Sequence, residues 1–242
     1  MKLFKLLILI FLLLDLNAKE LEVAKGNWPP YNYYENNIHK GFVTEVTNSI
    51  FKDMGYTASF KIYPWVRAES LILNDKVDAL YSASKKDNRE EKCYYPDEEL
   101  FNSKYVLFFR SNEVKKFKTL DDLKDLSIGV VKGYAYSDSI WKTLRKNRNY
   151  INFINDTIGF KNLASGKIDC FLAETGNGIY LSKKLNINDK IDYSPKPLVE
   201  KPYYIIFSKE RVTDSFVKRF SENLKKFKKT KKFKNIYNLY LK

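Results

Sequence analysis

The chain has 242 residues, of which 44% are hydrophobic and 16% aromatic, and its formal net charge is +14 at pH 7. This composition excludes a chain that is disordered throughout, and the length allows one large domain or two lobes with separate cores. Much of the excess charge lies at residues 209–242, which contain 12 Lys or Arg and 3 Asp or Glu. Apolar residues in this segment keep helical spacing, so we expect a docked helix with a solvated basic face rather than a nucleic-acid-binding tail.

The first residues, MKLFKLLILIFLLLDLNA, have the layout of a secretory signal peptide. Lys2 and Lys5 precede an apolar run at 6–14, and a short polar stretch ends on Ala18. The run is shorter than the roughly 20 apolar residues of a spanning helix, so we expect cleavage after export rather than a retained anchor. No cysteine stands at the exit, so no lipid anchor is expected. The sequence predicts a soluble, exported mature protein.

Strand and helix patterns alternate after the signal peptide. Apolar runs predict the strands, and residues at helical spacing, such as Val43, Val46 and Ile50, predict the helices between them. This alternation is typical of an α/β fold with parallel strands covered by helices. The expected elements are a strand at 21–26, a helix at 41–55, a strand at 57–63, a helix from about 67 and a strand at 77–83.

The same alternation restarts after an apolar strand at 104–111. The segment TLDD has the spacing of a helix-capping box. The junction SGKIDCFLAE in this unit is similar to NDKVDALYSA in the first, so we expect two lobes of related architecture. The expected elements are a helix start at 119–122, a strand at 127–133, a helix at 136–147, a strand at 150–156, a helix at 157–167 and a strand at 168–174.

Two apolar segments bracket the second unit, YVLFFRS before it and PYYIIFSKE after it. If both cross between the units, the first lobe is discontinuous and two strands form a hinge. A ligand is then expected in the cleft between the lobes. The predicted organisation is a signal peptide at 1–18, lobe 1 at 19–109 and 206–242, and lobe 2 at 110–205.

Residues that commonly carry catalysis or bind metals are sparse. The single His39 lies in the turn-like segment ENNIHKG, and the chain has neither a Ser/His/Asp set nor a His/Cys cluster with metal-ligand spacing. Cys170 lies in a buried-strand pattern and Cys93 in a distant polar stretch, so we expect two separate thiols rather than a disulfide. We therefore predict no catalytic residue, no metal, no cofactor and no enzymatic activity.

Five segments in order resemble a known family over nearly the whole chain after the signal peptide. The family is that of bacterial extracellular solute-binding proteins, family 3, the periplasmic receptors that deliver polar amino acids to ABC transporters. The resemblance implies a two-lobed type II periplasmic binding protein fold, a small-molecule ligand, a membrane ABC permease as partner, no nucleic acid and a monomer. The segments are NWPPYNYYENNIHKGFVTEVTNSIFKDMGY, LNDKVDALYSASKKDNREEKCYYPDE, TLDDLKDLSIGVVKGYAYSD, LASGKIDCFLAE and KKFKNIYNLYL.

The resemblance assigns ligand contacts in lobe 1. Trp28 in NWPPY matches an aromatic residue that stacks on the ligand, and Tyr31 of the same segment is also expected to contact it. Ser82 and Ser84 match a loop that hydrogen-bonds the ligand. Arg89 matches the arginine that holds the ligand's α-carboxylate, since a planar guanidinium can make two parallel hydrogen bonds to a carboxylate.

In lobe 2, the resemblance assigns Gly133 and Tyr134 to a strand-to-helix turn whose free N–H groups can meet an anion. Glu174 matches the acid that pairs with the ligand's α-ammonium. A zwitterion would then bind Arg89 and Glu174 together, and only closed lobes would satisfy both ends. Asp78 and Asp169 precede their strands and are expected to cap turns.

The chain departs from the family pattern at several of these positions. Lys86 stands where threonine is common, Tyr134 and Ala135 replace small hydroxyl residues, and Glu174 stands where aspartate is usual. The motif PWVRAES resembles a divergent subset of the family and adds Trp65 and Arg67 as candidate cleft residues. These departures leave the identity of the ligand open.

Two other functions are compatible with the same fold. Some dehydratases are similar to this family, and a carboxylic acid in a dry cleft with a raised pKa could act as a general acid. A ligand-sensing module that presents its closed lobes to a separate receptor is the other alternative.

Overall fold

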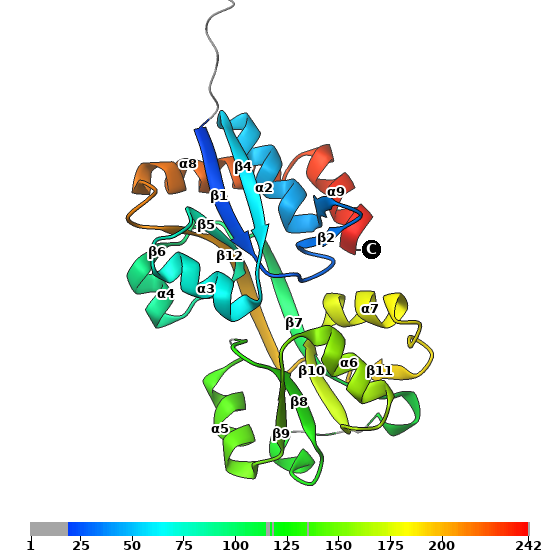
Figure 1. Cartoon of the computed structure of the whole chain (residues 1–242). Helices are drawn as coiled ribbons and strands as arrows, with labels where there is room; N and C mark the ends of the chain where they lie inside the picture. The colour runs from blue at the N-terminus through cyan, green and yellow to red at the C-terminus, as the bar shows by residue number, and fades with distance from the viewer. Residues whose placement is uncertain (1–18, 115–116, 118, 135, 242) are drawn as a thin grey trace, which may run out of the picture.

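The computed structural model of the chain describes residues 19–114, 117, 119–134 and 136–241. The predicted signal peptide therefore lies outside the described residues, as does Ala135. The described chain forms two lobes in which helices cover the faces of strands, and two long strands run between the lobes (Figure 1). The predicted two-lobed α/β architecture is confirmed.

The sheet of lobe 1 is built around β1 (Lys19–Lys25). This strand pairs in parallel with β4 (Tyr56–Ile62) on one side and with β5 (Ala79–Ala83) on the other. Parallel neighbours need crossover connections, and the helices α2 (Phe42–Asp53) and α3 (Trp65–Leu73) supply them. All five elements agree with the predicted ones apart from their ends.

Lobe 1 also contains short elements that the sequence did not predict. The hairpin β2 (Tyr33–Glu35) and β3 (Ile38–Lys40) follows β1. A short helix, α4 (Asp87–Lys92), and the two-residue strand β6 (Cys93–Tyr94) follow β5. Elements of this length contain too few residues to show a periodic pattern.

The basic C-terminal segment forms two helices that pack against α2, namely α8 (Asp214–Phe227) and α9 (Lys231–Leu241). The lysines of α8 lie at exposed positions, whereas Phe220 and Leu224 are fully buried. The predicted docked helix with a solvated basic face is confirmed, but it is divided at Thr230. The hydroxyl of Thr230 accepts a hydrogen bond from the backbone N–H of Phe233 at 3.1 Å, which caps the start of α9.

In lobe 2, the strand β8 (Ile128–Val131) pairs in parallel with both β9 (Tyr150–Phe153) and β10 (Cys170–Glu174). Among the α-helices described in this lobe, α5 and α6 were predicted, and α7 was not. The missed helix begins directly after β10. The helices are α5 (Asp138–Asn147), α6 (Asp156–Ala164) and α7 (Thr175–Lys184).

Shorter elements complete lobe 2. The segment TLDD forms only one 3-10 turn, η2 (Leu120–Leu123), but the predicted capping box is present between Thr119 and Asp122. A second 3-10 turn, η1 (Ser111–Glu113), and the edge strand β11 (Ile191–Tyr193) lie near the end of the connecting strand β7.

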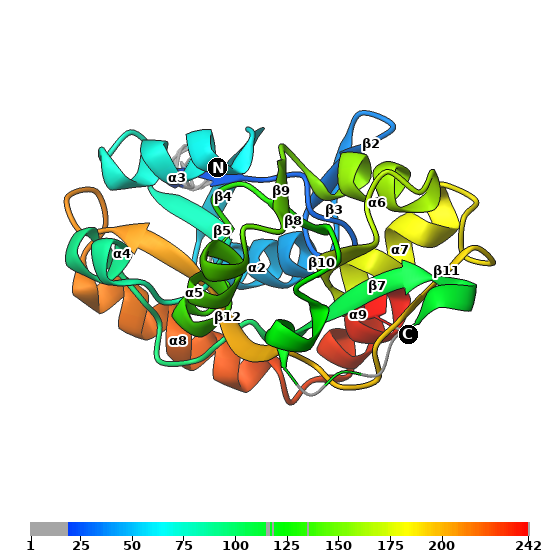
Figure 2. The same cartoon turned by 90° about the horizontal axis from the view of Figure 1, so that it is seen from below.

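The two connecting strands, β7 (Phe101–Arg110) and β12 (Val199–Ser208), run antiparallel to each other between the lobes (Figures 1 and 2). The first half of β12 pairs with β7, and its second half pairs with β5 and β6 of lobe 1. β7 also pairs with β10 and β11 of lobe 2. β12 therefore belongs to the sheets of both lobes, and the predicted pair of hinge strands is confirmed.

Two further expectations concern cysteines and membrane spans. Cys93 and Cys170 are both buried and no disulfide joins them, as predicted. Among the residues that the structure describes, no helix has the length and apolar character needed to cross a bilayer.

Equivalent aspartates occupy the same position in the two lobes. The Asp78 carboxylate accepts a hydrogen bond from the backbone N–H of Glu22 at 2.7 Å, just before β5 starts beside β1. The Asp169 carboxylate accepts one from the N–H of Ser127 at 2.7 Å, just before β10 starts beside β8. Each carboxylate ties the starts of two parallel strands together. The sequence predicted that both residues cap turns, whereas these hydrogen bonds reach the start of the neighbouring strand.

We predict that Asp78→Ala lowers the free energy of unfolding by about 1–3 kcal/mol, because it leaves the N–H of Glu22 without its acceptor and Arg211 with Glu22 as its remaining carboxylate partner. Urea denaturation measures the change. The exposed Asp53 is a matched control, and Asp53→Ala should stay within about 0.5 kcal/mol of the parent. Equal losses in the two variants would contradict this role for Asp78.

Candidate ligand-binding site

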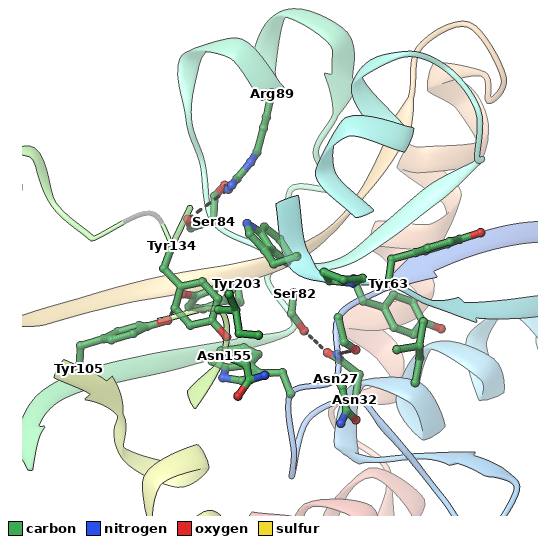
Figure 3. A pocket seen from close by; sticks show the side chains of 17 residues that line it. Asn27, Asn32, Tyr63, Ser82, Ser84, Arg89, Tyr105, Tyr134, Asn155 and Tyr203 are labelled. Carbon is green, nitrogen blue, oxygen red and sulfur yellow. Dashed lines mark hydrogen bonds between the residues drawn. The ribbon is translucent and has the colours of Figure 1, made fainter. Parts of the chain in front are cut away.

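A cavity of about 430 Å³ lies where the two lobes and the connecting strands meet (Figure 3). Lobe 2 contributes Tyr134, Ile154 and Asn155, the connecting strands contribute Tyr105 and Tyr203, and lobe 1 contributes the remainder. This volume is within the usual range for small-molecule sites. The lining residues are Gly26, Asn27, Trp28, Asn32, Ile62, Tyr63, Pro64, Trp65, Tyr81, Ser82, Ser84, Arg89, Tyr105, Tyr134, Ile154, Asn155 and Tyr203.

Six of the ten predicted contact residues line this cavity, and four do not. Gly133 is not among the lining residues, and a Cβ atom there would be 2.9 Å from the side chain of Val66 in lobe 1. Arg67 is exposed on α3, and Tyr31 and Glu174 are buried elsewhere between the lobes. The six that line the cavity are Trp28, Trp65, Ser82, Ser84, Arg89 and Tyr134.

The sequence missed much of the aromatic lining. Tyr105 and Tyr203 lie on segments that were predicted to cross between the lobes, so their position near a cleft followed from the topology. Which side chains of those strands face the cavity depends on register, and the sequence of a fully buried strand does not reveal it. Asn155 had a usable signal, since it stands immediately before the first residue of α6 and caps that helix.

Arg89 is held in place by the protein itself. Its side chain is 1% exposed, and Nε donates a hydrogen bond to Glu69 Oε1 at 2.8 Å. Nη1 donates to the carbonyl oxygen of Ser84 at 2.8 Å, and the guanidinium lies 5.2 Å from the ring centre of Trp65. Because α4 begins just after β5, this arginine is delivered to the cavity edge with its orientation already set.

Ser82 adopts a backbone conformation that residues other than glycine seldom use. Its φ is +57°, in the left-handed region, which costs about 1–2 kcal/mol for an L-residue. Its hydroxyl donates to Asn32 Oδ1 at 2.5 Å, and Asn32 Nδ2 donates to the carbonyl oxygen of Gly26 at 2.9 Å. The strained end of β5 is thereby tied to the loop after β1, and both segments line the cavity.

Three tyrosines of the cavity use their hydroxyls on other protein groups. Tyr105 and Tyr203 share a hydrogen bond of 2.7 Å between their hydroxyls. Tyr134 donates to the carboxylate of Asp156 at 2.7 Å. Trp28 packs against Tyr203 with ring centres 5.2 Å apart. The cavity is therefore walled mainly by ring surfaces, which suit a flat or apolar part of a ligand.

Asp156, which the sequence did not single out, is a buried carboxyl behind Tyr134 at the start of α6. Burial raises the pKa of Asp156 to about 6, although the hydrogen bond from Tyr134 acts in the opposite direction. Asp156 is not among the lining residues, because Tyr134 lies between it and the cavity.

Glu174 ends β10 and caps α7. Its Oε2 accepts a hydrogen bond from the backbone N–H of Asn177 at 2.7 Å, and the side chain is 3% exposed. Burial raises the pKa of Glu174 to about 7, and hydrogen bonds from the N–H groups of Asn177 and Gly176 and from Tyr31 partly offset this rise. The carboxyl thus faces Tyr31 of lobe 1 rather than the cavity, and a contact with the ligand stays a prediction.

One face of α7 contacts lobe 1 directly, in the segment around β2 (Figure 1). Asn177 Nδ2 donates to the carbonyl oxygen of Pro29. The rings of Tyr180 and Tyr33 lie 5.6 Å apart, and Lys184 pairs with Glu35 at 2.6 Å. The spacing of these three α7 residues puts them on one side of the helix. The lobes therefore touch each other beside the cavity, in a closed arrangement.

Within the described residues, no group of three or more His, Cys, Asp or Glu side chains is placed to hold a metal ion. A larger hollow of about 790 Å³ lies between α7 and α9. Of the ten predicted contact residues, Tyr31 alone is among the described residues that line this hollow. The 430 Å³ cavity is the better candidate site, since six predicted contacts line it.

The two-lobed fold with a cavity between the lobes agrees with the proteins to which this chain is similar. The family of bacterial extracellular solute-binding proteins, family 3, matches residues 23–242, and the chain belongs to this family. No curated protein sequence matches the chain.

Solved structures similar to this chain share its fold. An ancestral arginine-binding protein bound to arginine has a TM-score of 0.78 at 20% identity, over 92% of this chain and 98% of that one. A histidine kinase sensor domain with similarity to periplasmic binding proteins has a TM-score of 0.79 at 19% identity, over 91% and 96%. An ancestral amino acid-binding protein, a precursor of cyclohexadienyl dehydratase, has a TM-score of 0.76 at 18% identity, over 92% and 96%. The predicted type II periplasmic binding protein fold is confirmed.

We predict that Glu174→Gln reduces the pH dependence of stability. The pKa of this carboxyl is about 7 in the folded protein against 4.5 ordinarily, so the folded state binds more protons between these pH values. The free energy of unfolding of the parent should therefore fall as pH rises from about 4.5 to about 7. In the variant, the free energy of unfolding should fall less over this pH range. The fall that remains comes from Asp156, whose pKa is also raised by burial.

Urea denaturation at pH 5 and pH 8 measures the difference. Glu222→Gln, at an exposed position of α8, is the matched control and should behave like the parent. If the free energy of unfolding had the same pH dependence in Glu174→Gln and in the parent, a pKa of about 7 for Glu174 would be contradicted.

Proposed function

We propose that this protein is a periplasmic solute-binding receptor of an ABC importer. It binds a small polar solute, an amino acid or a related compound, in the cavity between its lobes and closes around it. The observation that carries the proposal is the lining of this cavity, to which both lobes and both connecting strands contribute. A ligand that contacts both lobes binds the closed form more tightly than the open form, and so shifts the hinge equilibrium toward closure.

Family membership supports export and binding, since the family consists of extracellular solute-binding proteins. The proposed route is cleavage of the signal peptide at residues 1–18, capture of the solute in the periplasm by a monomer, and recognition of the closed form by a membrane permease. Arginine bound to an ancestral relative of the same fold is one precedent for a polar amino acid in such a site.

The proposed ligand contacts are the six predicted residues that line the cavity. Arg89 supplies a cation for an acidic group, Ser82 and Ser84 supply hydroxyls, and the aromatic residues pack on the body of the ligand. Tyr31 and Glu174 act instead through the contact between the lobes, where both are buried. The aromatic contacts are Trp28, Trp65 and Tyr134.

A thermal-shift screen of amino acids, dicarboxylates and small amines tests the binding function. A ligand at 100 times its Kd should stabilise the mature protein by about 2.7 kcal/mol, which raises Tm by roughly 5–10 °C. Arg89→Lys keeps the positive charge but loses the planar fork, so we expect its Kd for the same ligand to rise at least about tenfold.

Arg145→Ala on the exposed surface of α5 is the control and should leave Kd unchanged. Circular dichroism verifies that each variant is folded. The absence of any stabilising solute across the three classes would count against the receptor function, and an unaltered Kd in Arg89→Lys would remove Arg89 from the site.

The contact between α7 and lobe 1 predicts a second measurable effect. In Lys184→Glu, the new carboxylate would face Glu35, so the ion pair of 2.6 Å becomes a repulsion. We expect a larger radius of gyration for the ligand-free protein in small-angle X-ray scattering, and a Kd for the screened ligand that is a few times higher. Lys183→Glu makes the same charge change at the exposed neighbouring residue, and its scattering curve should be the same as that of the parent. Identical curves for all three proteins would show that this contact does not hold the lobes together.

A further inference from the structure

The cavity between the lobes contains hydrogen-bond donors that the protein leaves unused. Nη2 of Arg89, Nε1 of Trp28 and Nε1 of Trp65 are buried atoms without a hydrogen-bond partner among the described residues. Nη2 also lies 2.8 Å from Glu69 Oε1 as an ion pair, and of its two N–H bonds at least one is without an acceptor. All three side chains line the cavity. Since buried donors are normally paired, these three nitrogen atoms point to a partner that brings acceptor oxygens.

The side-chain amide oxygens of the cavity are already in use. Oδ1 of Asn32 accepts from the hydroxyl of Ser82, as described above, and the other two side-chain amide oxygens of the lining also accept protein hydrogen bonds. Oδ1 of Asn27 accepts from the backbone N–H of Tyr34 at 3.3 Å, and Oδ1 of Asn155 accepts from that of Ile158 at 3.0 Å. The cavity therefore offers donors in excess, which matches a ligand rich in acceptors.

The charges around the cavity also favour an anion. None of the described residues that line it is acidic. Of the nearby carboxylates, Glu69 pairs with Arg89, Asp156 accepts from Tyr134, and Glu174 caps α7. In addition, the ammonium group of Lys201 lies 5.6 Å from the ring centre of Tyr203. An ammonium group of a ligand would therefore find no acidic partner among the described lining residues.

The walls of the cavity add a requirement on shape. The lining contains seven aromatic side chains, and the hydroxyls of Tyr105, Tyr134 and Tyr203 are turned toward other protein groups. Ring surfaces bind flat, apolar groups best.

We propose that the cavity binds aromatic carboxylates and that the ligand needs no α-ammonium group. The carboxylate oxygens accept hydrogen bonds from the unused donors of Arg89 and the two indoles, and the ring of the ligand packs between the aromatic walls. This inference rests on the proposed receptor function and narrows its ligand class. Glu174 then contributes to lobe closure and not to recognition of an amine.

Matched probes that differ by one group test the inference. 3-Phenylpropionate is phenylalanine without its ammonium, and phenethylamine is phenylalanine without its carboxylate. Indole-3-propionate, tryptophan and tryptamine form a second matched series. Isothermal titration calorimetry on the mature protein should give a Kd for one of the two acids at least about tenfold lower than for its amino acid, with no binding of the amine. A Kd for the amino acid equal to or below that of its acid would overturn the inference.

Two variants test the indole donors separately from the rings. Trp28→Phe and Trp65→Phe each keep an aromatic ring but remove Nε1, so the Kd of the tighter acid should rise roughly three- to tenfold. Trp141, on α5 and outside the cavity lining, is the control, and Trp141→Phe should leave Kd unchanged. If neither cavity variant weakened binding relative to the control, the donor argument would be wrong.

Failure of the inference can be told apart from failure of the receptor function. If an amino acid, dicarboxylate or amine from the thermal-shift screen binds and neither acid does, the ligand class is wrong and the receptor function stands. If no compound of the screen and neither acid binds, both are contradicted.

Discussion

The structure depends on one constraint, which is that β12 belongs to the sheets of both lobes. Its first half pairs with β7 and its second half with β5 and β6, so the lobes cannot separate without bending this strand and its neighbour. The ends of β1 and β5 from one lobe, and the loops after β8 and β9 from the other, are therefore brought to a common point. The cavity lies at that point, with Tyr105 and Tyr203 of the connecting strands in its wall.

The two lobes use the same junction for different purposes. In both, an aspartate ties the start of a strand to its parallel neighbour. At the far end of β5, the left-handed conformation of Ser82 turns polar groups into the cavity. At the far end of β10, Glu174 instead caps α7 and is buried against lobe 1. One repeated unit thus supplies cavity-lining residues on one side and contact between the lobes on the other.

The sequence predicted the site where chemistry and chain position coincide. Ser82 lies at the end of β5 and Arg89 follows that strand, and these positions bring both residues to the cavity. The role of Glu174 was harder to predict, because the helix that it caps begins with Thr-Gly-Asn-Gly, a segment of weak helix propensity. The sequence predicted a ligand contact for this carboxylate and did not predict that it caps α7. Its three-residue spacing to Asn177 became meaningful only with the helix present.

The sequence by itself determined the alternation of strands and helices, the repeat of two α/β units, the crossing segments and the family. These features are local or periodic, so burial patterns and capping residues specify them. Tertiary structure alone decided which side chains of the connecting strands face the cavity, which carboxylates are already paired, and which donors remain unused. Those properties depend on register and on contacts between residues such as Arg89 and Glu69, or Tyr134 and Asp156, that only folding brings together.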